Sequence, residues 1–202
     1  MVHSLMEEDV DPDPVAQFAK WWDEAIQSGI DEINAMTLAT ATASGEPSAR
    51  IVLLKDFNKE GFIFFSNYES HKGRELLANP KACLVFFWKE LERQVRITGS
   101  VDKILAAESD RYFASRPRGS QVGAWASPQS RAIPNRAFIE QQMELSDKQF
   151  IEEDIPRPQH WGGYIVKPAV IEFWQGRPNR LHDRIQYSLT DKEGWGIVRL
   201  AP

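Results

Sequence analysis

The chain has 202 residues, of which 42% are hydrophobic and 26% charged, and its formal net charge is −5. This composition is that of a folded globular protein, and its acidic balance argues against nucleic acid or a membrane surface as a partner. The single cysteine excludes a disulfide within the chain and a thiolate metal cluster.

The N-terminal part is expected to be an arm followed by one helix. Residues 1–12 are predicted to form a flexible acidic arm. Asp13 before Pro14 is typical of a helix start, because Asp caps free N–H groups and Pro suits the first helical turn. Apolar residues such as Phe18 then recur at helical spacing until Gly29, so an amphipathic helix is predicted there.

From residue 35 onward, short β-prone segments alternate with turns that contain Gly, Pro or Asn. Strands joined by such turns favour antiparallel pairing over alternating strands and helices. Residues 13–202 are therefore expected to form a single domain, mainly β, with an antiparallel barrel and peripheral helices. Strands are predicted at 35–42, 48–57, 62–66, 82–88, 93–103, 163–174, 184–189 and 195–200. Helices are predicted at 70–78, 105–115 and 135–150, with a Gly-, Pro- and Ser-rich loop region between the last two.

Several common functional motifs are missing from the sequence. There is neither a G-x-G-x-x-G nor a G-x-x-x-x-G-K-[ST] phosphate loop, and no G-x-S-x-G nucleophile motif. The four histidines lack metal-ligand spacing, so no metal site is expected. Any chemistry is expected to come from an organic cofactor. No apolar run is long enough to span a membrane and no secretory signal is visible, which favours a cytoplasmic location.

The strongest candidate site is the cationic segment 180–184. On a strand, Arg180, His182 and Arg184 would share one face, and their repulsion would be relieved by a bound anion. Trp174 lies just upstream and could form an aromatic wall for a planar phosphorylated ligand. The alternative is the solvated face of an edge strand.

A second candidate combines Tyr112 with the segment 116–120. Arg116 and Ser120 flank a Pro and a Gly, so a tight turn here would offer guanidinium, hydroxyl and backbone N–H donors to a phosphate. Tyr112 lies four residues before Arg116 and would face the same ligand if the helix continued. An exposed polar loop is the alternative.

A third candidate is the predicted helix start at Ser70, His71 and Lys72. The first turn of a helix has free N–H groups and a positive dipole end, so it can bind an anion. In the alternative, Ser70 is an ordinary N-cap and Lys72 is solvated.

Two further candidates lie on predicted strands. Arg50 and Lys55 are five residues apart, so an uninterrupted strand would point them to opposite faces. They could serve one ligand only through a bulge, or two ligands from two sides. Gln94 could bind the polar edge of a flat heterocycle, although a polar surface position is the simpler interpretation.

The segments that carry these candidates resemble the pyridoxine/pyridoxamine 5′-phosphate oxidase family of the FMN-binding split-barrel superfamily. The resemblance runs from about residue 35 to Pro202. The matching segments are Arg50-Ile-Val-Leu-Leu-Lys55, Leu91-Glu-Arg-Gln-Val95, Tyr112-Phe-Ala-Ser-Arg116-Pro-Arg-Gly-Ser120, Gly123-Ala-Trp-Ala-Ser-Pro-Gln129-Ser130, Phe173-Trp-Gln-Gly176 and Arg180-Leu-His-Asp-Arg184.

The resemblance implies a split β-barrel homodimer that binds FMN at the subunit interface. The FMN contacts that it implies are Arg50, Ile51, Val52, Leu53, Leu54, Lys55, Phe65, Ser66, His71, Lys72, Gln94, Gln129, Ser130, Trp174 and Arg184. The implied substrate contacts are Lys55, Tyr112, Arg116, Ser120, Arg180 and His182, with Arg180 and His182 in the catalytic positions. Two phosphates, one on FMN and one on the substrate, would share the cationic groups.

The implied reaction is FMN-dependent oxidation of pyridoxine and pyridoxamine 5′-phosphates to pyridoxal 5′-phosphate, with O2 as acceptor and H2O2 as product. The alternatives are a split-barrel flavin reductase and a non-catalytic module that binds FMN or pyridoxal phosphate. The chain departs from the family at His71, where an Arg is usual, which predicts weaker or more pH-dependent FMN retention. The family's basic, tyrosine-bearing N-terminal lid has no counterpart in the acidic residues 1–13.

Overall fold

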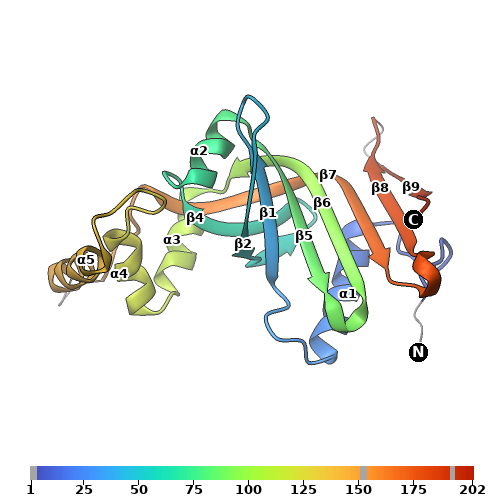
Figure 1. The fold of residues 1–202 in the computed structure, drawn as a ribbon, viewed down its shortest axis with the longest axis horizontal. Helices are drawn as coiled ribbons and strands as arrows, with labels where there is room; N and C mark the ends of the chain where they lie inside the picture. Colours follow the sequence, from blue (N-terminus) through green and yellow to red (C-terminus); the bar gives the residue numbers. More distant parts are fainter. Residues whose placement is uncertain (1–3, 151–153, 192–193) are drawn as a thin grey trace.

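The computed structural model describes residues 4–150, 154–191 and 194–202 (Figure 1). Its centre is an antiparallel sheet that curls into a half-barrel, with strand order β2-β1-β5-β6-β7-β4-β3 and with β8 and β9 continuing from β7. The strands are β1 (Ala35–Ala41), β2 (Pro47–Leu53), β3 (Asp56–Asn58), β4 (Gly61–Asn67), β5 (Lys81–Trp88), β6 (Arg93–Lys103), β7 (Trp161–Gln175), β8 (Asp183–Leu189) and β9 (Trp195–Arg199). The mainly β, antiparallel fold predicted from the sequence is confirmed.

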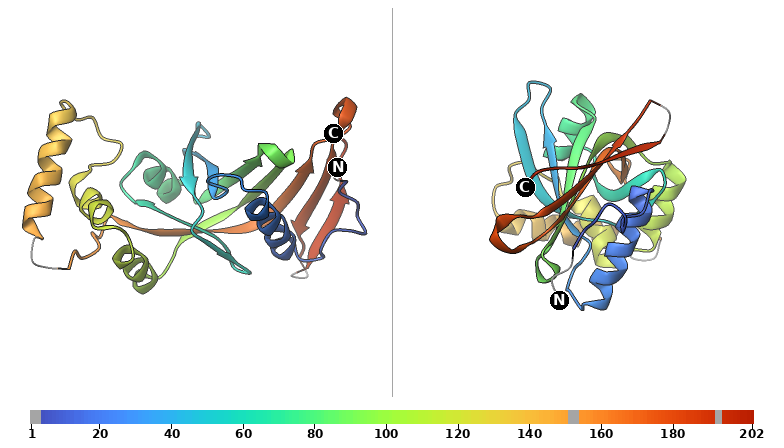
Figure 2. Two further views of the ribbon diagram at one scale, coloured as in Figure 1. Left: turned by 90° about the horizontal axis from the view of Figure 1, so that it is seen from below. Right: turned by 90° about the vertical axis from the view of Figure 1, so that its right-hand side faces the viewer.

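Helices lie around the sheet. They are α1 (Pro14–Gln27), α2 (His71–Ala78), α3 (Ala106–Ala114), α4 (Arg118–Ala126) and α5 (Arg136–Gln149), with short 3₁₀ turns at η1 (Lys89–Leu91) and η2 (Pro178–Arg180). Figure 2 shows α3, α4 and α5 at one end of the molecule and β8 and β9 at the other. None of the helices in the described part of the chain is long and apolar enough to cross a membrane.

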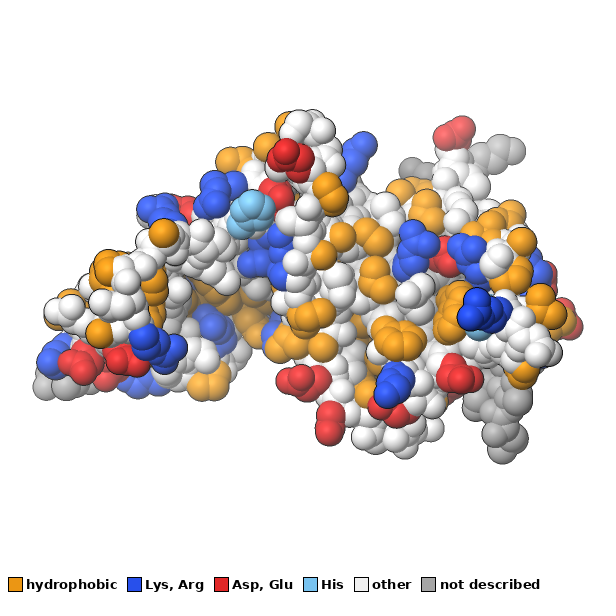
Figure 3. Space-filling model, in the orientation of Figure 1, with side chains coloured by type: hydrophobic (Ala, Val, Ile, Leu, Met, Phe, Trp, Pro, Cys, Tyr) orange, Lys and Arg blue, Asp and Glu red, His pale blue; other side chains and the backbone are white. Residues whose placement is uncertain are grey.

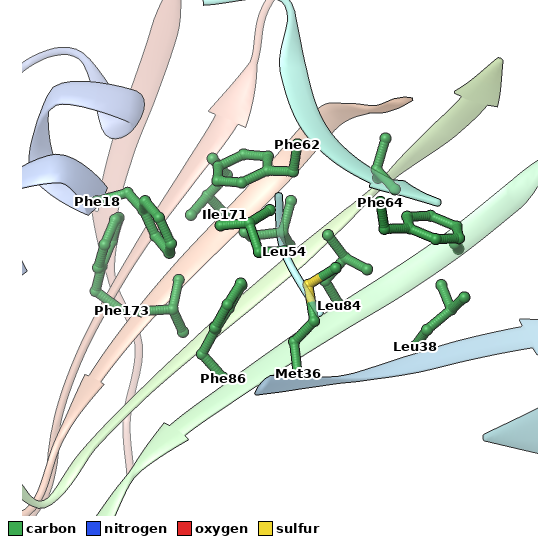
Figure 4. Close-up of a cluster of buried hydrophobic side chains, with 14 of the residues drawn as sticks. Phe18, Met36, Leu38, Leu54, Phe62, Phe64, Leu84, Phe86, Ile171 and Phe173 are labelled. Carbon is green, nitrogen blue, oxygen red and sulfur yellow. The ribbon is translucent and has the colours of Figure 1, made fainter. Parts of the chain in front are cut away.

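The core lies inside the half-barrel, under α1 (Figure 4). Phe18 from α1 is fully buried, and its ring centre lies 5.0 Å from that of Phe62 on β4 and 5.2 Å from that of Phe86 on β5. The buried Arg93 on β6 also fixes the helix, because its guanidinium pairs with Glu24 and stacks on Trp21 at 4.4 Å. These contacts pack α1 against the sheet, on strands β4, β5 and β6.

The strand predicted at 48–57 is interrupted, which corrects the sequence prediction. β2 ends at Leu53 and pairs with β1, whereas β3 begins at Asp56 and pairs with β4. Between them the Leu54 N–H donates to the Asn34 carbonyl at 2.8 Å, and the Lys55 N–H donates to the Ile63 carbonyl at 2.9 Å. The chain therefore changes partner at residues 54–55, and the strict alternation of faces is lost there.

Two more local predictions are wrong. The loop region expected between 115 and 135 contains α4, because Pro117 starts a new helix in which the Ser120 and Gln121 N–H groups both donate to its carbonyl. Residues 180–182 are not on a strand. Asn179 and Arg180 have left-handed backbone angles, φ 58° and 61°, and β8 begins only at Asp183.

The described part of the predicted N-terminal arm contacts β8 and β9. Leu5 is buried and its N–H donates to the Asp183 carboxylate at 3.2 Å. Arg199 donates to both carboxylate oxygens of Glu7 at 2.7 Å. The Tyr187 hydroxyl donates to the Asp11 carbonyl at 2.7 Å. Residues 1–3 of the arm lie outside the described residues.

Candidate functional site

A cavity of about 780 Å³ lies between the sheet and the helices at one end of the molecule. Figure 3 shows the hollow between the helices on the left and the sheet, with blue Lys and Arg side chains around it. Its lining comes from β2 and the β2–β3 junction, β4, α2, α3, the turn between α3 and α4, α4, the loop after α4 and the start of β7. The lining residues are Arg50, Ile51, Val52, Leu53, Lys55, Phe65, Ser66, His71, Lys72, Tyr112, Arg116, Pro117, Ser120, Gln129, Ser130 and Trp161.

The break between β2 and β3 brings Arg50 and Lys55 to this one cavity. On an unbroken strand the two side chains would point to opposite faces of the sheet, but here both line the cavity. The Arg50 guanidinium is held by the Thr40 hydroxyl and by the Ser48 hydroxyl, each at 2.5 Å. Arg50 is thus fixed in orientation, and one ligand can contact both cations. Leu54, between them, is buried in the core and does not line the cavity.

One anion-binding group lies at the start of α2. Ser70 caps the helix, accepting from the Gly73 N–H at 3.3 Å, which is the role that the alternative interpretation of this segment gave it. The Lys72 ammonium is buried and donates to the Ser66 hydroxyl at 3.0 Å and the Ser70 hydroxyl at 3.4 Å. Among the described residues no carboxylate lies within 4 Å of it. Burial, and then the nearby Arg50 charge, lower the pKa of Lys72. Such a buried cation with only neutral partners is stabilised by an anionic ligand.

A second anion-binding group lies across the cavity, on α3 and α4. The Arg116 guanidinium stacks on the Trp161 ring at 4.6 Å, and its Nη1 atom is buried without a hydrogen-bond partner in the described part of the structure. Burial lowers the pKa of Arg116. Tyr112 and Ser120 line the same cavity. α3 ends at Ala114, so Arg116 is placed by the following turn and not by a continuous helix.

One part of the cavity wall is aromatic and flat. The rings of Phe65 and Tyr112 are stacked with centres 3.9 Å apart, and Phe65 and Trp161 are stacked at 5.4 Å. Sequence reasoning missed Trp161. The available signal was an aromatic residue directly before Gly162 and Gly163, at the start of a strand. Stacked rings next to cations form a surface that suits a planar, phosphorylated ligand.

The loop after α4 closes another side of the cavity through Gln129 and Ser130. Ser130 has a left-handed φ of 66°, an uncommon conformation for a residue other than Gly. An ion pair between Arg131 and Glu69 at 2.6 Å connects this loop to the segment before α2. The two sequence segments are therefore held at one rim.

The remaining predicted site residues form a second cluster far from the cavity. Gln94 on β6 pairs in register with Trp174 on β7, which pairs with Arg184 on β8. The His182 ring centre lies 4.6 Å from that of Trp174. His182 Nδ1 accepts from a backbone N–H at 3.1 Å. Arg180 is exposed in the turn before β8. None of these five residues lines the cavity.

Arg184 in this cluster has a carboxylate partner within the chain. The sequence had instead predicted three cations on one face that only a bound anion would neutralise. Arg184 donates to the buried Glu172 carboxylate at 2.9 Å and to the Ala201 carbonyl at 2.9 Å. Glu172 also pairs with Arg96 at 3.2 Å. Hydrogen bonding to Glu172 raises the pKa of Arg184. No group of three His, Cys, Asp or Glu residues in the described chain could hold a metal ion.

An exposed apolar face adjoins the cavity. Ile51 and Leu53 are 65% and 37% exposed, and Phe87 on β5 is 61% exposed. Ile51 and Leu53 pair with β1, which also pairs with β5, so the three side chains belong to neighbouring strands. Figure 3 shows orange side chains over these strands. Exposed apolar surface of this kind marks an interaction face.

Comparison with known proteins gives matches along most of the chain. The family model of pyridoxamine 5′-phosphate oxidase matches residues 22–149, and that of the pyridoxine 5′-phosphate oxidase C-terminal dimerisation region matches residues 161–202. A pyridoxine/pyridoxamine 5′-phosphate oxidase of Cupriavidus metallidurans is 57% identical over 202 residues, covering 100% of this chain and 95% of the relative. One of Salinibacter ruber is 56% identical over 200 residues, covering 98% and 93%. The dimerisation region supports a homodimer.

Solved structures agree on the fold. PhzG from Burkholderia lata, in complex with tetrahydrophenazine-1-carboxylic acid, superposes with a TM-score of 0.92 at 28% identity, covering 100% of this chain and 99% of PhzG. An FMN-binding protein related to pyridoxamine 5′-phosphate oxidase, from Nostoc punctiforme, has a TM-score of 0.73 at 15% identity, with coverage of 99% and 100%. The second likeness concerns the fold alone.

Proposed function

The chain belongs to the pyridoxamine 5′-phosphate oxidase family, and from this premise we propose that it oxidises pyridoxine 5′-phosphate and pyridoxamine 5′-phosphate to pyridoxal 5′-phosphate. FMN is the proposed cofactor, O2 the acceptor and H2O2 the second product. The observation that carries the proposal is the presence of two separate cationic groups in one cavity. One of them includes a buried guanidinium nitrogen, on Arg116, that has no partner in the described chain.

The residues at the start of α2 fit the phosphate of FMN. The Lys72 ammonium is buried beside two hydroxyls, and the backbone N–H groups of His71 and Lys72 precede the first intrahelical hydrogen bond of α2 and can donate to an anion. Arg50 adds a guanidinium from β2, and His71 lines the same part of the cavity. The β2 residues up to Leu53 and the loop residues Gln129 and Ser130 would contact the rest of the molecule. When bound, FMN supplies the two-electron redox chemistry.

The second cationic group fits the phosphate of the substrate. Arg116 Nη1 is desolvated and unpaired, so an anion there replaces hydrogen bonds that the chain itself does not provide. Tyr112 and Ser120 add hydroxyl donors, and Lys55 adds a charge from the β2–β3 junction. The stacked rings of Phe65, Tyr112 and Trp161 exclude water from one wall. These residues bind and orient the substrate and do not need to exchange protons with it.

The distant cluster is proposed to act in the site of a second subunit. Trp161 begins β7 and Trp174 lies near its other end, roughly 40 Å away at the rise of an extended strand. One small ligand cannot contact both residues of the same protomer. In a homodimer the Gln94–Trp174–Arg184 row, with Arg180 and His182, can instead complete the partner's cavity, and FMN would then lie at the subunit interface. Arg180 would pack over the reacting ring, and His182 would hydrogen-bond its polar substituents.

An oxygen-consumption assay with both phosphorylated vitamers, with and without added FMN, tests the proposed function. We expect turnover with peroxide formation, stimulated by FMN. A yellow protein without turnover would instead indicate a non-catalytic flavin-binding module, and reduction of other acceptors in place of O2 would indicate a reductase. A tetrahydrophenazine carboxylic acid, the type of ligand bound to PhzG, serves as a third substrate. Exclusive turnover of that compound would overturn the proposal. A cytoplasmic location stays a prediction.

A further inference from the structure

Glu75 on α2 is a buried carboxylate that does not line the cavity. Its Oε2 atom accepts from the Thr40 hydroxyl at 2.5 Å and the Ser48 hydroxyl at 2.6 Å, and lies 3.4 Å from an Arg50 nitrogen. Its Oε1 atom lies 3.0 Å from His71 Nε2. One carboxylate therefore contacts side chains from β1, β2 and α2.

The contacts divide between the two oxygens. Oε2 faces the strands and Oε1 faces the imidazole one helical turn earlier. Burial raises the pKa of Glu75, but the hydrogen bonds from Ser48 and Thr40, together with the nearby His71 and Arg50, lower it, and the net pKa lies below the usual value. The Glu75 carboxylate is thus charged at neutral pH.

Arg50 and His71 are the two Glu75 partners that reach the cavity. The separation of 3.4 Å between Arg50 and Glu75 is long for an ion pair, and Oε2 is shared with two hydroxyls. The carboxylate consequently orients the guanidinium without neutralising it through a bidentate pair. The Arg50 charge remains available to a ligand, and the same carboxylate holds the His71 side chain on α2.

We propose that Glu75 is the positioning residue of the FMN phosphate site. It fixes Arg50 from the sheet and His71 from α2 relative to each other, so that both side chains meet one phosphate. The inference rests on the proposed function, because it takes FMN as the ligand of this part of the cavity. It assigns no contact between Glu75 and FMN. Its consequence is selective: loss of Glu75 must weaken binding of the phosphate and not of the flavin ring.

The test compares FMN with riboflavin, which lacks the phosphate. Dissociation constants of both are measured by quenching of flavin fluorescence for the wild type, Glu75→Gln and Glu140→Gln. Glu140 is the matched control, since it forms an exposed pair with Arg136 four residues away, on α5. We expect E75Q to weaken FMN binding about ten-fold, the size of one lost charge-assisted hydrogen bond, and riboflavin binding less than about two-fold. E140Q should leave both constants unchanged.

Equal weakening of both flavins by E75Q would show a merely structural role and overturn the inference, as would unchanged binding of both. If E75Q fails to fold, Glu75→Asp takes its place, because it keeps the charge and the Ser48 hydroxyl that also holds Arg50, but shortens the side chain that reaches Ser48 and Arg50. The same selective loss, of smaller size, is then expected, and an unchanged FMN-to-riboflavin ratio overturns the inference. A wild-type chain that binds neither flavin would instead overturn the proposed function itself.

Discussion

The guanidinium carbon of Arg116 lies 4.6 Å from the centre of the Trp161 ring, and the Nη1 atom of the same group is buried without a partner in the described chain. The ring holds the cation in place, while the missing hydrogen bond leaves a donor for a ligand. Arg116 thus forms an anion site in which one hydrogen bond is made only when a ligand binds.

Replacement of Arg116 should mainly weaken substrate binding. We expect R116A to raise KM for pyridoxine 5′-phosphate about 10- to 100-fold with a smaller change in kcat, because a hydrogen bond to the substrate's charged phosphate is lost. Steady-state kinetics in O2-saturated buffer measure this. R118A is the matched control, since Arg118 is exposed and paired with Asp147. A fall in kcat at unchanged KM would contradict the assignment of Arg116 to the substrate phosphate.

Arg180 should show the opposite pattern if it packs over the reacting ring. We expect R180A to lower kcat more than R116A does. Because the two residues are proposed to meet only across a dimer, co-expression of the two variants with different tags should restore activity. Random pairing makes half of the dimers hybrid, each with one intact site, so about a quarter of all sites recover. Absence of any recovery in purified hybrid dimers would place Arg180 and Arg116 in the same subunit's site.

Much of the sheet could be predicted because its strands follow a simple alternation. β6 begins and ends at Arg93 and Lys103 as expected, with every second residue buried up to Val101. The break after Leu53 could not be predicted, because Leu54 continues the apolar run of the strand. Only the hydrogen bond from its N–H to the Asn34 carbonyl, which the sequence does not indicate, marks the change of partner. α4 was missed because its Gly and Ser residues favour loops locally, whereas the burial of Val122 in a second apolar cluster, with Phe113 and Trp161, favours a helix.

Only part of the candidate site could be predicted from the sequence. Chemical reasoning from residue types found the cations at Arg50, Lys72 and Arg116, but neither the cofactor nor the way strands bring them together; the family resemblance supplied the cofactor. The predicted common face of residues 180–184 failed because Arg180 has a left-handed backbone. Glu75 could not be singled out, since three of its four partners, Thr40, Ser48 and Arg50, lie on strands 25 or more residues away in the sequence.

The apolar face should be needed for dimer formation. We expect Phe87→Glu to place a charge in this face and shift the protein from dimer to monomer, with reduced FMN retention. Light scattering after size-exclusion chromatography measures the mass, and absorbance of the same peak measures bound flavin. Leu145→Glu on α5 is the control, because Leu145 is also exposed, at 53%, but lies on another element. A dimeric F87E variant would exclude this face from the interface.

The contact of the N-terminal segment with Arg199 should weaken at low pH. Hydrogen bonding to Arg199 lowers the pKa of Glu7 from 4.5 to about 2. A lowered folded-state pKa means that the contact stabilises the folded segment above pH 4.5 and is lost as pH falls from there toward 2. Limited proteolysis of the N-terminus and NMR titration of the Glu7 carboxyl should follow this range. The variant E7Q should be cleaved quickly at pH 7, and E8Q should not; equal rates for all three proteins would contradict the role of the pair.

Restoring the usual arginine at position 71 should strengthen FMN binding and make it less sensitive to pH. His71 lines the cavity at the start of α2, where we propose that the FMN phosphate binds, and an imidazole is ordinarily neutral at pH 8 whereas a guanidinium stays charged. We expect H71R to bind FMN about ten-fold more tightly than the wild type at pH 8, and with a smaller advantage at pH 6. The phosphate itself also titrates near pH 6, but identically for both proteins, so the ratio of their Kd values isolates the side chain. H71A should bind weakly at both pH values. A ratio that stays at one across the pH range would mean that position 71 does not contact the phosphate.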